Sequence, residues 1–447
     1  MRLAPRPLSL QIHKLFAIVA ISAMIGSNLF MSRVRLLPLT LFGLFLAISP
    51  AGAAAGNWVA AWASSPADPG SLGYSFQSPG GFRNRSMRNV VRCSIGGQAV
   101  RLRVSNSLGT ETVVFDEVYA GIQQRGSRLV GGSNKAVTFG GKRRIAVPGG
   151  AVAVSDPVNL AITPAQHLVV SLYTASAGGA VTSHPAAFHD SYISAPGNFA
   201  GDEDGNGFTL IARSWFFLSA VDVLAAPQVK GAIVAFGDSI TDGDGSSLNG
   251  DKRWPDALSR RIAARGGAFS VVNSGIGGNR VLSNSPCFGI STLARLERDV
   301  LSQMGIRAVI FLQGINDIIH PELAAHNDKL KPCVNSPQVS FEELIAAYQQ
   351  VAAQVHARGI RIYGGTILPY QGFTAWTKDG EAKRKAINNW IRSAGVFDAV
   401  IDFAKAVADR SNASKLVRGF DSGDHLHLND AGYAAMANAA DAVIVRE

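Results

Sequence analysis

In the second half of the chain, apolar runs of strand length are repeatedly followed at once by a short polar loop. Residues 231–236 lead into Gly237-Asp238-Ser239, and residues 269–272 and 308–312 lead into similar glycine- and asparagine-containing loops. Helix-like segments separate the runs, and such alternation is typical of a parallel α/β sheet. Because parallel strands end at a common edge, the sequence predicts that these polar loops meet there.

Further elements follow from the same patterns. Helical spacing of apolar residues predicts helices at residues 255–264, 292–303, 341–357, 381–393 and 431–445, and apolar runs predict strands at 363–368 and 399–403. The segment 318–340, with its Pro and charged residues, is expected to be a long loop that shapes a pocket without forming an apolar lid.

The polar loops contain the residue types that acyl transfer requires. A serine such as Ser239 needs an adjacent base, and histidine suits that task because its pKa of about 6.5 lies near neutral pH. Asp424 and His427 are three residues apart, so one turn brings both side chains to the same side. We therefore expect His427 to act as base and Asp424 to orient it, with the neighbouring His425 uninvolved.

Attack on an ester carbonyl places negative charge on oxygen, which needs preorganised hydrogen-bond donors. The candidates are the backbone amides of Ser239 and Gly278 and the side-chain amide of Asn316. A glycine at position 278 permits close backbone approach and a positive φ.

These blocks resemble those of the GDSL, or SGNH, hydrolases, a family named for a Ser, a Gly, an Asn and a His in four separated blocks. The resemblance covers residues 231 to about 445 and rests on Gly237-Asp238-Ser239-Ile240-Thr241, Asn273-Ser274-Gly275-Ile276-Gly277-Gly278, Gly314-Ile315-Asn316-Asp317 and Asp424-x-x-His427.

The resemblance implies a flavodoxin-like three-layer α/β/α fold and ester hydrolysis without metal or cofactor. It assigns Ser239 as nucleophile, Gly278 and Asn316 to the oxyanion hole, and Asp424 and His427 to the remaining catalytic positions. The chain departs from the pattern at Ile240, where leucine is usual, and at Leu428, where a proline often follows the histidine.

Other functions remain open from these residues. His425 and His427 with Asp424 offer ligands of the kind that bind zinc. The same catalytic residues would also serve an O-acetyltransferase that passes the acyl group to a sugar, or a lipase. A carbohydrate-binding protein with a degenerate hydrolase domain is the non-enzymatic alternative.

Residues 57–223 differ from the catalytic half. Short runs with period-two alternation, separated by Gly, Pro and Asn, predict an all-β sandwich or jelly roll, followed by a linker at 224–230 and a catalytic domain at 231–447. The clearest runs are residues 90–94, 99–105, 113–119 and 168–173. Such a domain before the hydrolase resembles secreted bacterial GDSL-type esterases associated with polysaccharide breakdown. Five tryptophans are expected to be core residues rather than sugar-stacking platforms: Trp58, Trp62, Trp215, Trp254 and Trp376.

The first 55 residues predict export. Basic residues, an apolar run at 36–49 and small residues before Ala55 form a secretory signal, with Met31 as the natural start. The leader has two apolar runs, at residues 15–30 and 36–49. Both are shorter than the roughly 20 residues of a spanning helix, so a retained membrane anchor is disfavoured. We expect a secreted or periplasmic protein without stable membrane insertion after leader removal.

The net charge and the number of cysteines limit the partners and the disulfides that we expect. Residues 1–53 contain five basic and no acidic residues, so their removal lowers the formal net charge from +10 to +5, which gives no case for nucleic-acid binding. The expected partner is a small-molecule or polysaccharide ester. Three cysteines permit at most one disulfide, for which Cys287 and Cys333 are the candidates, with Cys93 buried; the alternative of unbridged thiols stays open. The oligomeric state is not predicted.

Overall fold

The structure, a computed structural model, describes residues 56–67, 81–328, 330–334 and 337–445. The predicted leader, residues 1–55, lies outside this part of the chain. None of the helices in the described part is long and apolar enough to cross a bilayer.

A five-stranded parallel sheet forms the centre of the second half of the chain. Its order is β17 (Phe269–Gly275), β16 (Gly231–Gly237), β18 (Ile306–Leu312), β19 (Arg361–Gly365) and β20 (Ala399–Ile401). Every residue of β16 is buried, as expected for a central strand covered on both faces. The next strand in the chain, β17, lies on one side of β16, and the later strands β18, β19 and β20 lie on its other side. The strand order therefore reverses at β16, and ligands bind at such a switch point in open α/β sheets.

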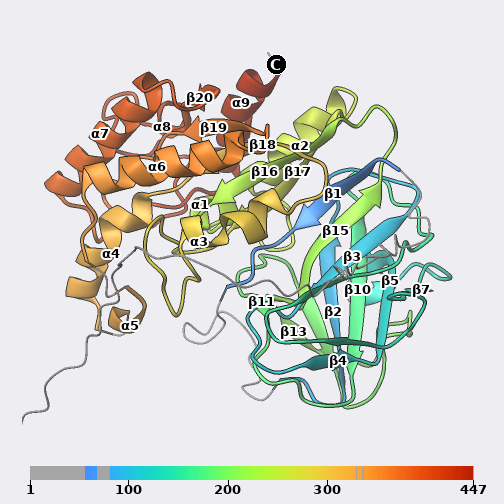
Figure 1. Cartoon of the computed structure of the whole chain (residues 1–447). Coiled ribbons are helices and arrows are strands. Elements are labelled where there is room, and N and C mark those ends of the chain that lie inside the picture. Colours follow the sequence, from blue (N-terminus) through green and yellow to red (C-terminus); the bar gives the residue numbers. More distant parts are fainter. Residues whose placement is uncertain (1–55, 68–80, 329, 335–336, 446–447) are drawn as a thin grey trace, which may run out of the picture. The chain divides into compact units, whose positions relative to one another are not determined.

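Helices connect these strands (Figure 1). By contact they fall into two groups, one in which α2 and α8 touch α9, and one in which α6 touches α3 and α7. They are α1 (Ser239–Asp242), α2 (Trp254–Ala264), α3 (Thr292–Leu296), the π-helical turn η1 (Glu297–Leu301), α4 (Ile315–His326), α5 (Lys331–Val334), α6 (Phe341–His356), α7 (Lys378–Ser393), α8 (Phe403–Val407) and α9 (Asp430–Ile444).

Helix α6 illustrates why these segments are helical. Ser340 and Glu343 form a capping box at its start, which satisfies amides that have no partner within the helix. Leu344, Tyr348 and Val351 are buried at helical spacing, so one face of α6 packs inward, while Gln349 and Gln350 on the other face are exposed.

Three predicted boundaries were wrong. The strand predicted at 363–368 is β19, which begins at Arg361 and ends at Gly365. Residues 318–340 are not a long loop, because α4 continues to His326 through Pro321 and α5 follows at Lys331. Pro321 lies inside α4, where its missing amide costs one helical hydrogen bond, and α4 still continues because it packs on α5 and α7. The predicted strand at 399–403 ends at Ile401, since the Asp402 side chain accepts the amide of Lys405 and thereby caps α8.

The first half of the described chain is rich in antiparallel β-structure (Figure 1, blue to green). One sheet has the order β1 (Trp58–Ala63), β15 (Leu218–Leu224), β3 (Val100–Ser105) and β9 (Val152–Val154). The larger sheet has the order β13 (Phe208–Ala212), β12 (Ser191–Ser194), β2 (Arg85–Arg92), β10 (His167–Thr174), β5 (Glu117–Arg125) and β6 (Arg128–Leu129), with β7 (Lys135–Ala136) also on β5. There are also two separate two-stranded sheets. One pairs β11 (Ser183–His184) with β14 (Trp215–Phe216), and the other pairs β4 (Val113–Phe115) with β8 (Ile145–Val147).

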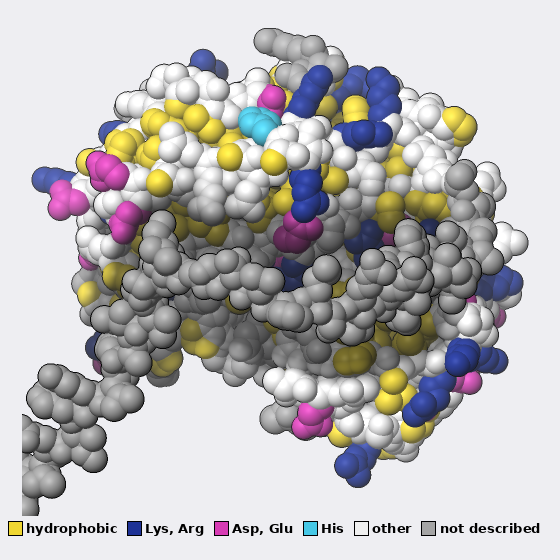
Figure 2. Space-filling model, in the orientation of Figure 1, with side chains coloured by type: hydrophobic (Ala, Val, Ile, Leu, Met, Phe, Trp, Pro, Cys, Tyr) yellow, Lys and Arg dark blue, Asp and Glu magenta, His cyan; other side chains and the backbone are white. Residues whose placement is uncertain are grey.

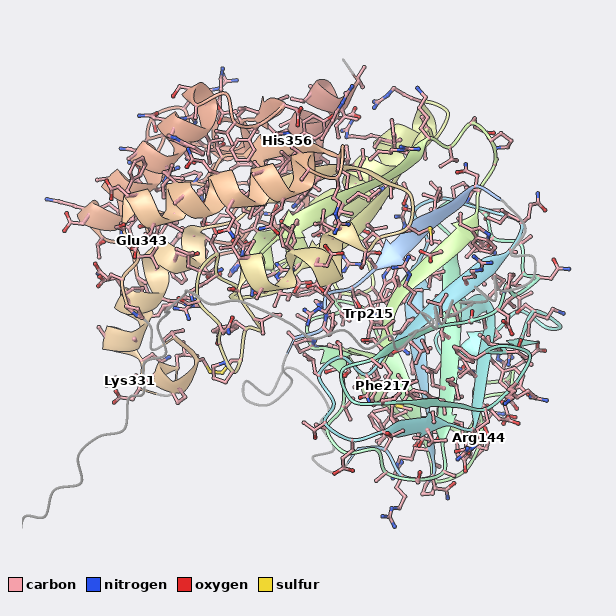
Figure 3. All side chains as sticks on the ribbon, viewed as in Figure 1. Arg144, Trp215, Phe217, Lys331, Glu343 and His356 are labelled. Atoms are coloured by element: carbon pink, nitrogen blue, oxygen red, sulfur yellow. A yellow bond between two sulfur atoms is a disulfide. The ribbon has the colours of Figure 1, made fainter. Side chains whose placement is uncertain are left out.

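The β-rich half and the α/β half share one hydrophobic core. Buried hydrogen bonds cross the junction, including one between the hydroxyls of Ser94 and Ser270 at 2.7 Å. Trp215, labelled in Figure 3, is buried there and packs edge-to-face on Trp62. Trp254 is also buried, so the core role expected for these three tryptophans is observed, whereas Trp58 and Trp376 are half-buried.

The charged surface residues do not form one patch on the face drawn in Figure 2. Dark blue Lys and Arg side chains lie at several separate places among hydrophobic and uncharged ones, with Asp and Glu between them.

A disulfide joins Cys287 to Cys333, with the two Cα atoms 5.3 Å apart. It ties the segment that follows β17 to α5, across 46 positions of sequence. The third cysteine, Cys93, is a buried thiol whose pKa burial raises to about 12, so it is a poor partner for exchange.

Replacing both bridged cysteines, as Cys287→Ser with Cys333→Ser, is expected to lower the free energy of unfolding by about 2–4 kcal/mol, because the cross-link restricts the unfolded chain. Urea denaturation with and without reductant measures the difference. The reduced wild-type protein should match the double variant, and the double variant should not respond to reductant. A wild-type midpoint that is the same with and without reductant would show that the bridge contributes nothing.

Candidate active site

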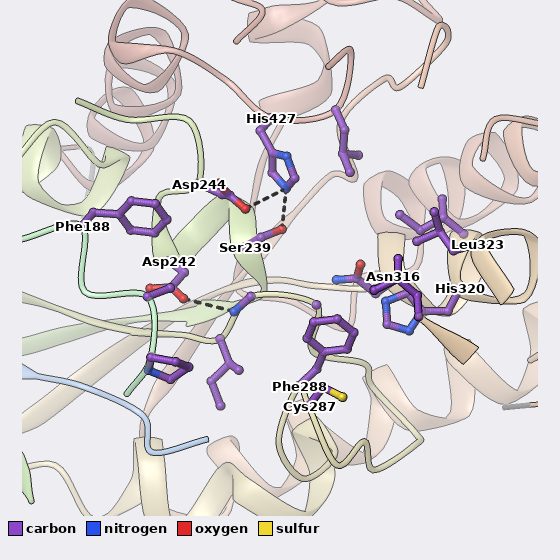
Figure 4. A pocket seen from close by; sticks show the side chains of 18 of the residues that line it. Phe188, Ser239, Asp242, Asp244, Cys287, Phe288, Asn316, His320, Leu323 and His427 are labelled. Carbon is purple, nitrogen blue, oxygen red and sulfur yellow. Dashed lines mark hydrogen bonds and ion pairs between the residues drawn. The ribbon is translucent and has the colours of Figure 1, made fainter. Parts of the chain in front are cut away.

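The nucleophile candidate Ser239 is the first residue of α1, directly after the carboxyl end of β16. Asp238 caps this short helix by accepting the amide of Ile240 at 3.1 Å, and Gly243 ends it with φ of 113°. The resulting strand-to-helix turn is tight, and Ser239 keeps only 5% of its surface exposed. Its hydroxyl faces the cavity drawn in Figure 4.

His427 and Asp424 lie in the loop that precedes α9. Their side chains contact each other, as the spacing predicts, and His427 also reaches Ser239. The His427 ring contacts Ser239 Oγ through Nε2 at 2.9 Å and Asp424 Oδ2 through Nδ1 at 2.6 Å. Asp424 Oδ1 accepts the amides of Leu426 and His427, which fixes the carboxylate. The loop therefore holds the imidazole in one orientation between a carboxylate and a hydroxyl.

The surroundings of Asp424 and His427 favour the ionised carboxylate and the protonated imidazole. Burial alone would raise the pKa of Asp424, but hydrogen bonds and the charge of His427 bring it well below its usual value. Burial alone would likewise lower the pKa of His427, whereas Asp424 and Asp244 raise it, and the net shift is upward. Asp244 Oδ2 lies 3.8 Å from His427 Nε2 (Figure 4).

Gly278 and Asn316 line the same cavity as Ser239 and His427. Gly278 has φ of 70°, and a Cβ there would lie 2.3 Å from the Phe288 ring, so both conformation and space require glycine. Asn316, near the start of α4, donates to the Asn279 carbonyl at 3.0 Å, which aims its amide.

His425, expected to be uninvolved, turns away from this group. It has φ of 66° and its Nδ1 lies 2.6 Å from Asp421 Oδ2. The hypothetical zinc ligands His425, His427 and Asp424 therefore do not converge on one point. Within the described residues, the set that could hold a metal ion is His167, His189 and Asp251, in which His167 Nε2 already lies 2.9 Å from Asp251 Oδ2.

Two residues that the sequence reasoning missed hold the loops in place. Arg295 is fully buried and donates to the carbonyls of Gly237 and Ser274 and to the side chain of Asn279. Asp317 accepts the amide of Val281 at 2.9 Å, and burial raises its pKa to about 6. Asp317 is adjacent to Asn316 and could have been noticed, but no local signal marks Arg295.

The cavity has a volume of about 610 Å³ and is lined from both halves of the chain. Its catalytic edge is shown in Figure 4, where Phe288 and His320 stand beside Asn316. From the α/β half come apolar side chains, among them Ile319, Leu323, Leu330 and Phe373. The β-rich half contributes His184, Pro185, Ala186, Phe188 and Arg213.

Comparison with known proteins identifies the family of the α/β half. Residues 235–435 match the model of the GDSL-like lipase/acylhydrolase family. No curated protein matches the chain significantly.

Several solved structures resemble the chain at low identity. They include an acetyl xylan esterase, AlAXEase (22% identity, 48% of this chain and 99% of that one, TM-score 0.37), a GDSL-like lipase from Bacteroides thetaiotaomicron (17%, 48% and 88%, 0.36) and a lipase/acylhydrolase from Enterococcus faecalis (19%, 48% and 94%, 0.34). The motif blocks lie within the segment that matches the family model, and residues 235–435 therefore form a GDSL-like lipase/acylhydrolase domain, which makes the chain a carboxylic ester hydrolase.

Proposed function

We propose that this chain is a secreted serine esterase that removes short acyl groups, acetyl above all, from carbohydrate. The observation that carries the proposal is the His427 ring, which is hydrogen-bonded at once to Ser239 Oγ and to the Asp424 carboxylate. A flavodoxin-like three-layer domain, supported by the strand order and the two helix groups, and a jelly-roll-like β-domain complete the proposed architecture.

In the proposed mechanism, Ser239 Oγ attacks the ester carbonyl carbon while its proton passes to His427 Nε2. Asp424 keeps Nδ1 protonated and stabilises the imidazolium. The tetrahedral intermediate collapses as His427 gives its proton to the leaving alcohol, leaving an acyl group on Ser239. Water then attacks this ester with His427 as base, and the acid departs as the serine regains its proton.

The oxyanion that forms in both steps needs donors in place beforehand. The proposed donors are the amides of Ser239 and Gly278 and the side chain of Asn316, all of which border the cavity. The hydrogen bond from Asn316 to the Asn279 carbonyl uses one of its two amide hydrogens and leaves the other available.

Ser239→Ala is expected to reduce turnover of a chromogenic acetate ester by about 10⁴-fold or more, because the nucleophile is lost while the fold is kept. The control is Ser393→Ala, an exposed serine at the end of α7 that should not affect the rate. Mass spectrometry after treatment with a fluorophosphonate should place the label on Ser239. Near-wild-type turnover by a folded Ser239→Ala variant would remove the basis of the assignment.

The pH dependence tests the base. Only neutral His427 accepts a proton, so kcat/KM should rise with pH to a plateau, and its midpoint should lie above 6.5 because the pKa of His427 is raised. Asp244→Asn removes a nearby negative charge and should move that midpoint to lower pH. A rate that is constant between about pH 5 and 8 would contradict the role of His427.

The substrate proposal rests on the cavity. Its volume of about 610 Å³ suits a sugar-sized ligand with a short acyl group, and the wall from the β-rich half offers polar groups such as Arg213. We place the acyl group against the apolar α/β side and the alcohol against the β-rich side.

A series of model esters tests this arrangement. We expect kcat/KM to be highest for acetate and to fall about tenfold or more by octanoate, and we expect free acetate from acetylated xylan. Ser239→Ala is the background control. A preference for octanoate or longer chains would indicate a lipase, and acyl transfer to an added sugar in place of free acetate would indicate an O-acetyltransferase.

Export is proposed on two grounds. The leader has the basic, apolar and small-residue segments of a secretory signal, although it lies outside the described residues. The disulfide between Cys287 and Cys333 is of the kind that persists in oxidising compartments.

A further inference from the structure

A buried His–Asp pair joins the β-rich half to the nucleophile helix. His184, on β11, places Nε2 3.0 Å from Oδ1 of Asp242, the last residue of α1. Both side chains are only 3% exposed. The two residues lie 58 positions apart, and the mechanism proposed above uses neither of them.

The surroundings of His184 require protons on both ring nitrogens. Nδ1 lies 2.8 Å from the Ser65 carbonyl, while Nε2 faces Asp242 and the Ala186 carbonyl, so both nitrogens meet acceptors. Burial alone would lower the pKa of His184, but Asp242 and the Ser65 carbonyl raise it, and the net shift is upward. The ring also stacks on Trp215, which fixes its plane.

Asp242 in turn contacts the loop that carries the oxyanion glycine. Its Oδ2 accepts the amide of Gly277 at 3.1 Å, a contact drawn in Figure 4. The packing between α1 and the end of β17, where this loop begins, is close, since a Cβ on Gly275 would lie 2.3 Å from the Asp242 amide nitrogen. The two carboxylate oxygens of Asp242 therefore join His184 to the residue before Gly278.

We propose that His184 is a positioning residue, whose imidazolium holds Asp242 so that Asp242 orients the Gly277–Gly278 backbone toward the reacting oxygen. This inference rests on the proposed esterase function. The ion pair between His184 and Asp242 would make the β-rich half part of the active site, in addition to its contribution to the cavity wall. Since a shift of about 1 Å in a positioned group can cost about 100-fold in rate, an indirect contact of this kind can control turnover.

The first test separates turnover from binding. His184→Gln retains one donor nitrogen but neither the charge nor the second donor nitrogen of the ring, and Asp242→Asn removes the carboxylate. For each we expect kcat on a short acyl ester to fall roughly 10- to 100-fold with KM changed less than about threefold, because an oxyanion donor acts mainly in the transition state. Titration with a fluorophosphonate counts folded, reactive sites, so that kcat is expressed per site.

The double variant His184→Gln/Asp242→Asn tests whether the two residues act as a unit. We expect its kcat to be no lower than that of the worse single variant. Multiplied losses would show that they act independently and would overturn the proposal, as would a His184→Gln enzyme whose kcat per titrated site is within about twofold of wild type.

The matched control is Ser94→Ala, which removes another buried hydrogen bond across the same junction. It should lower the thermal midpoint while leaving kcat per site unchanged. If it lowers kcat as much as His184→Gln does, the effect comes from the junction in general and the proposal is wrong.

Backbone hydrogen exchange provides a readout that does not depend on turnover. Peptides covering residues 274–281 should exchange faster in His184→Gln than in wild type, and not in Ser94→Ala. Unchanged exchange in His184→Gln would overturn the positioning role. Because this measurement stands even if wild-type protein hydrolyses no ester, failure of the esterase proposal and failure of this inference give different results.

Discussion

The buried guanidinium of Arg295 is the contact on which the active-site edge of the sheet depends. The carbonyls of Gly237 and Ser274, at the carboxyl ends of β16 and β17, both accept hydrogen bonds from it. Asp299 lies 3.3 Å away and compensates its charge, although burial still lowers the pKa of Arg295 to about 10. Backbone carbonyls at a buried strand end need such donors, because an unpaired buried polar group is costly.

The hydrogen bonds of Arg295 belong to a network that holds the proposed catalytic groups in position. Arg295 also donates to Asn279 Oδ1, and the Asn279 carbonyl accepts the Asn316 amide. One network thus joins two strand ends, the glycine loop and the asparagine of α4. The proposed catalytic groups are held by neighbours outside the proposed mechanism, which is how an active site stays preorganised.

The β-rich half is integrated into the same network. Its hydrophobic residues belong to the core that also contains the parallel sheet, and its loops form one wall of the cavity. The contact between His184 and Asp242 carries charge across the junction. A domain that only bound polysaccharide at a distance would need neither feature. The physical picture is of two folds that complete a single site.

The sequence by itself determined the local structure and the chemical groups. Apolar runs placed the strands, helical spacing placed α6 and α9 within one or two residues, and the Asp424–His427 spacing predicted a contact that one loop makes. These features depend on neighbours in sequence.

Only the tertiary structure decided which distant groups pair. Pro321 is tolerated inside α4 because the helix packs on α5 and α7. The residues next to Arg295 and His184 in the sequence give no signal of the partners that these two side chains bind. Local patterns report burial and periodicity, whereas a hydrogen bond between residues 58 positions apart depends on how the two halves pack.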